Sequence, residues 1–184
     1  MLGSKTIYIK DETHVIDMVG KGHRDILAFG HPLGLQRYRL DASGKPETPE
    51  EIFLDNVEEV GAVDVGDLDG NGRPDIVVFR DRDVDIIWND GAAAMPRRTR
   101  LPMTEERTTW GCLSDVDTNG TLDLVCLQKP PHALVVVRRG DGRGGFGPEL
   151  PVVCDHAESS RLLRDIDGSG PRIASIVGDG ANLR

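Results

Sequence analysis

The chain alternates short apolar runs with turns rich in Gly, Asp, Asn and Pro. Apolar runs at residues 26–29, 76–79, 124–127 and 174–177 each follow an acidic turn. Two further β-prone runs follow the first three of these, at residues 35–40, 84–88 and 133–137 and then at 51–54, 98–101 and 149–153. No useful stretch has helical periodicity. With the run that enters each acidic turn, the pattern predicts four short strands per unit, which is typical of a β-propeller blade.

The acidic turns form an internal repeat. The sequences are DMVGKGHRD at 17–25, DLDGNGRPD at 67–75, DVDTNGTLD at 115–123 and DIDGSGPRI at 165–173. Their first Asp residues are spaced by 50, 48 and 50 residues, which is too even for chance. We therefore predict an all-β fold of four propeller blades.

The predicted blades cover approximately residues 12–55, 61–102, 110–154 and 160–184, and the fourth is incomplete. The apolar run at residues 6–9 resembles the last strand of a preceding blade. The sequence thus predicts a partial propeller, or a fragment of a larger ring that its remaining blades or another copy of the chain complete.

Composition narrows the class of protein. Aromatic residues make up only 4% of the chain, whereas it contains 22 Gly and 11 Pro, which suits strands and turns. A net charge of −9 argues against nucleic-acid binding. No apolar run is long enough to insert into a membrane, and the N-terminal residues do not form a signal peptide.

The second and third acidic turns have the chemistry of calcium sites. Each places carboxylates at positions 1, 3 and 9, Asn at position 5 and Gly at position 6. Carboxylate, amide and backbone carbonyl oxygens suit Ca²⁺, and three converging carboxylates would repel one another without a cation. The predicted metal residues are Asp67, Asp69, Asn71, Arg73 and Asp75 in the second turn, and Asp115, Asp117, Asn119, Thr121 and Asp123 in the third.

The other two turns depart from this pattern. Asp165, Asp167 and Ser169 are candidate ligands in the fourth turn, but Ile173 removes the ninth carboxylate. In the first turn Val19 replaces a ligand, and the Lys21 ammonium could occupy the place of a cation. We predict weak or no binding in the fourth turn and no metal in the first.

These turns have three alternative interpretations. An EF-hand needs Glu at position 12, where this chain has Val78 and Cys126. The third turn also resembles a phosphatase nucleophile motif of the haloacid dehalogenase type, but the repetition of the pattern favours a metal turn. A plain acidic β-turn, in which Asp side chains cap the backbone, is the remaining alternative.

The second and third turns, with the apolar runs that follow them and the Gly-rich turns at 88–91 and 140–148, resemble FG-GAP/VCBS repeats. Such repeats form blades of integrin α-subunit heads, fungal propeller lectins and bacterial surface proteins, in rings that commonly have seven blades. The resemblance implies Ca²⁺ bound within a blade, and a binding or adhesion role outside the cytoplasm or at the cell surface.

The remaining chemistry is sparse. The five His are scattered, and no nucleophile–base arrangement is visible, so we expect no enzyme activity. Trp110 and, less so, Trp88 are candidates for stacking on a sugar, although core packing is the alternative for both. Cys112 and Cys126 lie three residues before and three residues after the third turn. They could form a disulfide across the hairpin, or they could be two buried thiols.

These features predict a non-catalytic, calcium-binding propeller module that binds a protein or glycan. The alternatives are a lectin proper, the accessory propeller domain of a polysaccharide-processing enzyme, or a scaffold that contacts only its own remaining blades.

Overall fold

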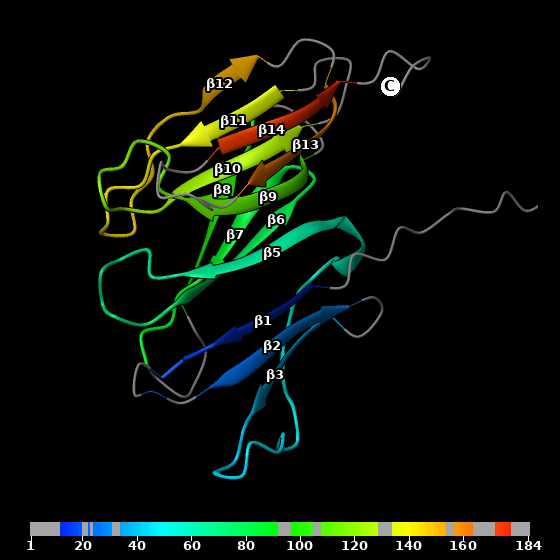
Figure 1. The fold of residues 1–184 in the computed structure, drawn as a ribbon, viewed down its shortest axis with the longest axis vertical. Coiled ribbons are helices and arrows are strands. Elements are labelled where there is room, and N and C mark those ends of the chain that lie inside the picture. The colour runs from blue at the N-terminus through cyan, green and yellow to red at the C-terminus, as the bar shows by residue number, and fades with distance from the viewer. Residues whose placement is uncertain are drawn as a thin grey trace, which may run out of the picture.

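The computed structural model describes residues 12–19, 22, 24–30, 34–91, 97–104, 108–128, 134–153, 157–163 and 172–177. These residues form antiparallel sheets that follow one another along the long axis of the molecule (Figure 1). The all-β prediction is confirmed. In the described part, the helical segment η1 (Val57–Glu59) is a single 3₁₀ turn, and no helix is long and apolar enough to cross a membrane.

Three sheets have four strands each, in chain order, joined by hairpins. The first contains β1 (Glu12–Ile16), β2 (Asp25–Gly30), β3 (Gly34–Arg39) and β4 (Glu50–Ile52). The second contains β5 (Val60–Gly66), β6 (Asp75–Arg80), β7 (Asp83–Ile87) and β8 (Arg98–Pro102). The third contains β9 (Thr108–Ser114), β10 (Asp123–Gln128), β11 (Leu134–Arg138) and β12 (Leu150–Val153).

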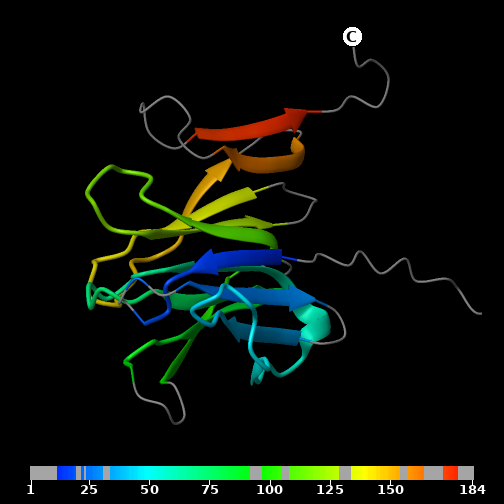
Figure 2. The same ribbon diagram turned by 60° about the horizontal axis from the view of Figure 1, so that its bottom comes forward.

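The fourth sheet pairs β13 (Ala157–Leu163) with β14 (Arg172–Val177). We call the four sheets blades 1 to 4. The acidic turns at 67–75 and 115–123 connect the first and second strands of blades 2 and 3. Both views show the strand series running through the molecule from β1 to β14 (Figures 1 and 2).

The first strands of neighbouring blades lie side by side. Strand β5 contacts β1 on one side and β9 on the other. His14 Nε2 lies 3.0 Å from the carbonyl oxygen of Val63, and the backbone N–H of Leu113 donates to Asp64 Oδ2 at 2.8 Å. Side chains of first strands therefore bond directly to the backbone of the next blade.

The core lies between blades, because alternate residues of a strand point to opposite faces of its sheet. Every residue of β6 is buried. Ile76 and Val78 pack with Leu27 of blade 1, whereas Val77 and Phe79 pack with Leu124 of blade 3. Blade 2 is thus covered on both faces.

The two described cysteines of blade 3 are buried and lie on opposite faces of the sheet, so they do not bond to each other. Cys112 is opposite Val125 in the strand pairing, and Cys126 is opposite Gly111. Cys126 faces the core between blades 2 and 3, and Cys112 packs on the other side. Burial raises the pKa of the Cys126 thiol to about 12. The predicted Cys112–Cys126 disulfide is therefore absent, and both side chains are buried.

Candidate metal sites

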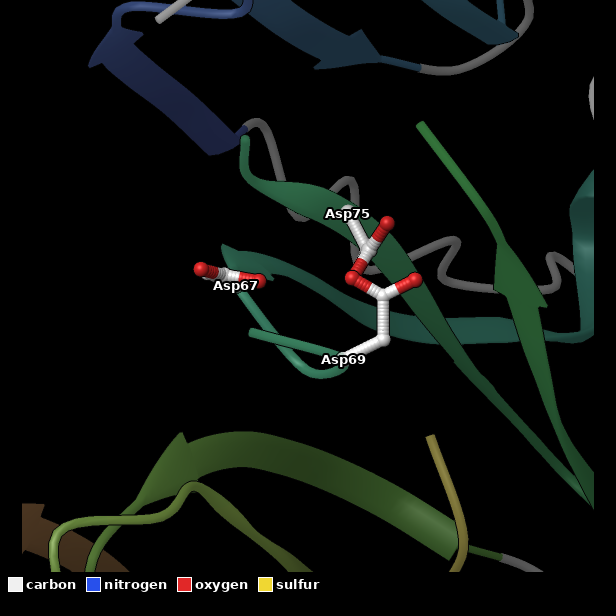
Figure 3. A group of neighbouring side chains, drawn as sticks. All are labelled: Asp67, Asp69 and Asp75. Carbon is white, nitrogen blue, oxygen red and sulfur yellow. The ribbon is translucent and has the colours of Figure 1, made fainter. Parts of the chain in front are cut away.

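Carboxylates converge in the second and third acidic turns. Asp67, Asp69 and Asp75 each offer an oxygen within 4.8 Å of the others. Figure 3 shows Asp69 and Asp75 reaching toward one another, with Asp67 on the adjoining arm of the turn. Asp115, Asp117 and Asp123 meet the same distance criterion. The predicted carboxylates therefore come together in both turns.

The first Asp of each turn is held by backbone N–H groups. In the second turn, Asp67 Oδ1 accepts from Asn71 at 3.1 Å and Asp67 Oδ2 from Gly72 at 2.8 Å. In the third turn, Asp115 Oδ1 and Oδ2 accept from Asn119 and Gly120 at 3.0 and 2.8 Å. The same two positions donate in both turns, so the chain wraps around the first carboxylate.

The ninth Asp of each turn is completely buried at the start of the second strand. Asp75 accepts from the backbone N–H of Leu68 at 3.0 Å and of Asn89 at 2.8 Å. Asp123 accepts equivalent bonds from Val116 and Gly140, both at 2.9 Å. Each buried carboxylate thus connects its own turn to the segment after the third strand.

Burial raises the pKa of Asp75 above its usual value. The N–H groups of Asn89 and Leu68 oppose this shift, and the nearby Asp69 and Asp67 carboxylates add to it. The ionised form of Asp75 is therefore disfavoured by its surroundings. A bound cation would remove this disadvantage, because it favours the charged carboxylate.

Asn at position 5 orders the middle of each turn. Asn71 Oδ1 accepts from the backbone N–H of Arg73 at 2.8 Å, and Asn119 Oδ1 accepts from that of Thr121 at 2.7 Å. Thr121 also donates its hydroxyl to Gly140 O at 3.0 Å. The donor set of each turn, with three carboxylates and an amide oxygen, fits a hard cation such as Ca²⁺.

An arginine contacts the third-position Asp of each turn. Arg97 Nη2 lies 3.6 Å from Asp69 Oδ2, and Arg139 Nε lies 3.4 Å from Asp117 Oδ2. Sequence reasoning missed both contacts, because Arg97 and Arg139 lie 28 and 22 residues after the Asp that each contacts. The Arg97 side chain is 53% exposed and that of Arg139 is 58% exposed. Because water screens such exposed charges, these pairs offset only part of the local negative charge.

The first turn retains the hydrogen bonds around its first Asp, but its ninth Asp pairs with an arginine. Asp17 Oδ1 accepts from the backbone N–H of Val19 at 3.1 Å, and Asp17 Oδ2 accepts from that of Gly22. The ninth residue, Asp25, pairs with Arg37 Nη2 at 2.7 Å. Arg37 thus provides a positive charge for the buried carboxylate of blade 1. Lys21 lies outside the described residues, as do Asp165, Asp167 and Ser169 of the fourth turn.

The first and second acidic turns are also tied to the next blade. Asn89 Nδ2 of blade 2 donates to Met18 O in the first turn at 2.7 Å. The backbone N–H of Gly144 in blade 3 donates to Leu68 O in the second turn at 3.1 Å. Order in a turn is therefore coupled to the junction between blades.

The two tryptophans differ in exposure. Trp88 is buried, and its indole N–H donates to Thr99 Oγ1 at 2.9 Å. The Arg97 guanidinium lies 4.3 Å from its ring centroid. Trp88 thus packs in the core between blades 2 and 3. Trp110 is partly buried beside two core clusters and is the more accessible candidate for ligand contact.

The fold and these turns define a β-propeller arrangement of repeated blades. Residues 17–78 match the family model of the FG-GAP-like repeat, which supports the predicted repeat resemblance over that part of the chain. No curated protein matches.

Two solved structures share the fold. A lectin of Agrocybe aegerita, described in terms of its recognition of non-reducing terminal N-acetylglucosamine, aligns at 21% identity with a TM-score of 0.65 over 91% of this chain. The Photorhabdus luminescens Tc holotoxin pore aligns at 15% identity with a TM-score of 0.53 over 88% of this chain. The chain spans 47% of the lectin and 9% of the toxin chain.

Proposed function

We propose that this protein is a non-catalytic binding module, extracellular or at the cell surface, whose propeller blades are stabilised by two Ca²⁺ ions. The observation that carries the proposal is the matched pair of carboxylate triads, in which oxygens of three Asp side chains lie within 4.8 Å of one another. Two such triads at corresponding positions are better explained by a cation than by two independent acidic turns.

Calcium would act on the fold in this proposal. Asp67, Asp69, Asn71 and Asp75 would hold one ion, and Asp115, Asp117, Asn119 and Asp123 the other, with the backbone at Arg73 and Thr121 completing the sets. Because each turn bonds to a neighbouring blade or third strand, a bound ion would stabilise junctions as well as hairpins.

Thermal unfolding in Ca²⁺ and in EGTA tests this proposal. We expect Ca²⁺ to raise the melting temperature of the wild type, and the D67A/D115A variant to lose that shift. The matched control is D17A, since Asp17 also accepts backbone N–H groups at position 1 but lies in the turn predicted to bind no metal. A wild-type melting temperature that does not respond to Ca²⁺ overturns the proposal.

A glycan is the ligand class that the comparisons favour. The lectin shares the fold over 91% of this chain, and Trp110 is partly exposed in the described part of blade 3. Glycan-array binding that Trp110→Ala abolishes, with a retained melting transition, would support a lectin. Binding to a protein ligand that is unaffected by free sugars would instead support adhesion.

A further inference from the structure

An arginine pairs with one Asp of the acidic turn in each of blades 1 to 3, but the pairing is firm only in blade 1. Arg37 donates to Asp25 Oδ2 from Nε at 3.1 Å and from Nη2 at 2.7 Å. Both side chains are largely buried, at 15% and 4% exposure. Two charge-assisted hydrogen bonds away from water make this guanidinium a fixed part of the first turn.

The arginines beside the second and third turns are held more loosely. Arg97 lies 3.6 Å from Asp69, and Arg139 lies 3.4 Å from Asp117, and both distances exceed the usual length of a hydrogen bond. More than half of each arginine side chain is exposed. Because an exposed pair of this kind contributes little to stability, another cation can displace the arginine at small cost.

The strands of blades 2 and 3 do not replace Arg37. The strand pairing places Ile86 of blade 2 and Val137 of blade 3 where blade 1 has this arginine. The buried Asp75 and Asp123 thus have an aliphatic side chain at the position from which Arg37 reaches the ninth Asp of blade 1. In these two blades the strands supply no cation at that position.

The arginines also leave the third-position Asp residues incompletely paired. Asp117 Oδ1 is buried and accepts no hydrogen bond among the described residues, while Arg139 approaches the other oxygen, Oδ2. The corresponding Asp69 Oδ1 accepts a long bond from the backbone N–H of Asn71 at 3.2 Å. A buried carboxylate oxygen without a donor is unfavourable, and a calcium ion that ligates it would remove that cost.

We propose that Arg97 and Arg139 are internal cations that compete with Ca²⁺ for Asp69 and Asp117, and so set the calcium affinity of the second and third turns. This inference rests on the calcium binding proposed above. Without calcium, each arginine offsets part of the negative charge of its turn. With calcium, the same positive charge stands beside a divalent ion and weakens its binding.

Arg97 keeps two other contacts when an ion takes Asp69. Its Nε lies 3.5 Å from Asp90 Oδ2, and its guanidinium lies 4.3 Å from the centroid of the Trp88 ring. Displacement by calcium therefore requires a shift of one exposed side chain, and the strands of blade 2 can stay in place.

Calorimetric titration with Ca²⁺ of variants that keep one site tests the proposal. A D115A background leaves the second turn, and a D67A background leaves the third. We expect R97Q in the first background and R139Q in the second to raise the calcium affinity about three- to tenfold at low salt, because a positive charge close to a divalent ion is removed. The melting temperature in EGTA should not rise in either variant, since an ion pair is lost.

R143Q is the matched control in both backgrounds. Arg143 is exposed and lies in the turn at 140–145, which bonds to Leu68 of the second turn and to Thr121 of the third. This variant removes a positive charge near both sites without removing the contact to a third-position Asp. We expect its calcium affinity to stay within about twofold of the parent, since exposed charges are screened.

The possible results separate this inference from the proposed function. A wild type that binds no Ca²⁺ overturns both. A wild type that binds Ca²⁺, with an affinity that R97Q and R139Q lower or leave unchanged, overturns only the competition, because arginines that position the carboxylates for the ion would give that result. An equal gain in R143Q overturns it as well, since the effect would then come from net charge alone.

Discussion

Thr118 and Gly70 occupy position 4 of their acidic turns, where the backbone adopts a left-handed conformation. Thr118 has φ of 58° and Gly70 has φ of 76°, both in the left-handed region. A β-branched residue is disfavoured there, whereas Gly adopts the conformation freely. The third turn therefore holds a conformation that its own sequence opposes, which its bonds to Asp115 and Asp123 maintain.

We expect Thr118→Gly to stabilise the protein by up to about 1 kcal/mol. Glycine removes the steric cost of the left-handed conformation, and this gain exceeds the loss that comes from the greater conformational entropy of glycine in the unfolded chain. The reciprocal change, Gly70→Thr, should destabilise it by a similar amount. Urea unfolding in EGTA measures both. A destabilising Thr118→Gly would contradict this account of the turn.

Asp55 shows how one residue joins two blades. The Arg80 guanidinium of β6 is 1% exposed and pairs with Asp55 Oδ1 at 3.2 Å, and Arg100 Nη2 of β8 lies 3.1 Å from the same oxygen. Burial alone would raise the pKa of Asp55, but the charges of Arg80 and Arg100 outweigh it and lower the pKa. Asp55 thus stabilises the junction in its ionised form.

We expect Asp55→Asn to cost about 1–2 kcal/mol at neutral pH, since Asp55 is 43% exposed but Arg80 is buried. A lowered folded-state pKa means that this stabilisation is present above the usual value of 3.8 and is lost as the pH falls through the folded value. The difference in unfolding free energy between wild type and variant should therefore shrink in acid. A difference that grows as the pH falls would refute the pairing.

At the scale of the strands, the sequence predicted most of the second, third and fourth strands of blades 1 to 3. The predicted runs at 76–79 and 124–127 lie within β6 and β10, and the run at 98–101 lies within β8. The even spacing of the repeats and the Asp- and Gly-rich turns were sufficient to predict these strands, because each acidic turn marks the position of a hairpin.

Contacts between blades were not predictable in the same way. Arg98 and Arg100, on the exposed face of the outer strand β8, reach Phe53 and Asp55 of the preceding blade. Nothing in a local pattern states which side chain of the next repeat an arginine meets. The pairing of Arg37 with Asp25, which gives the ninth Asp of the first turn a positively charged partner, was missed for the same reason.

At the scale of the whole molecule, blades 1 to 3 share an acidic turn between their first two strands. The positively charged group beside the carboxylates differs from blade to blade. Blade 1 uses Arg37, and blades 2 and 3 retain carboxylate triads with a partly exposed arginine beside each. The triads therefore predict two metal sites in the described part of the chain. This count distinguishes the proposal from a set of plain acidic turns, which would bind no calcium stoichiometrically.

Isothermal titration of the metal-free chain with Ca²⁺ tests that count most directly. We expect two ions per chain for the wild type and for D17A, and one ion for either D67A or D115A. No saturable binding to the folded wild type, or a count that D17A lowers while D67A and D115A leave it unchanged, would contradict the account.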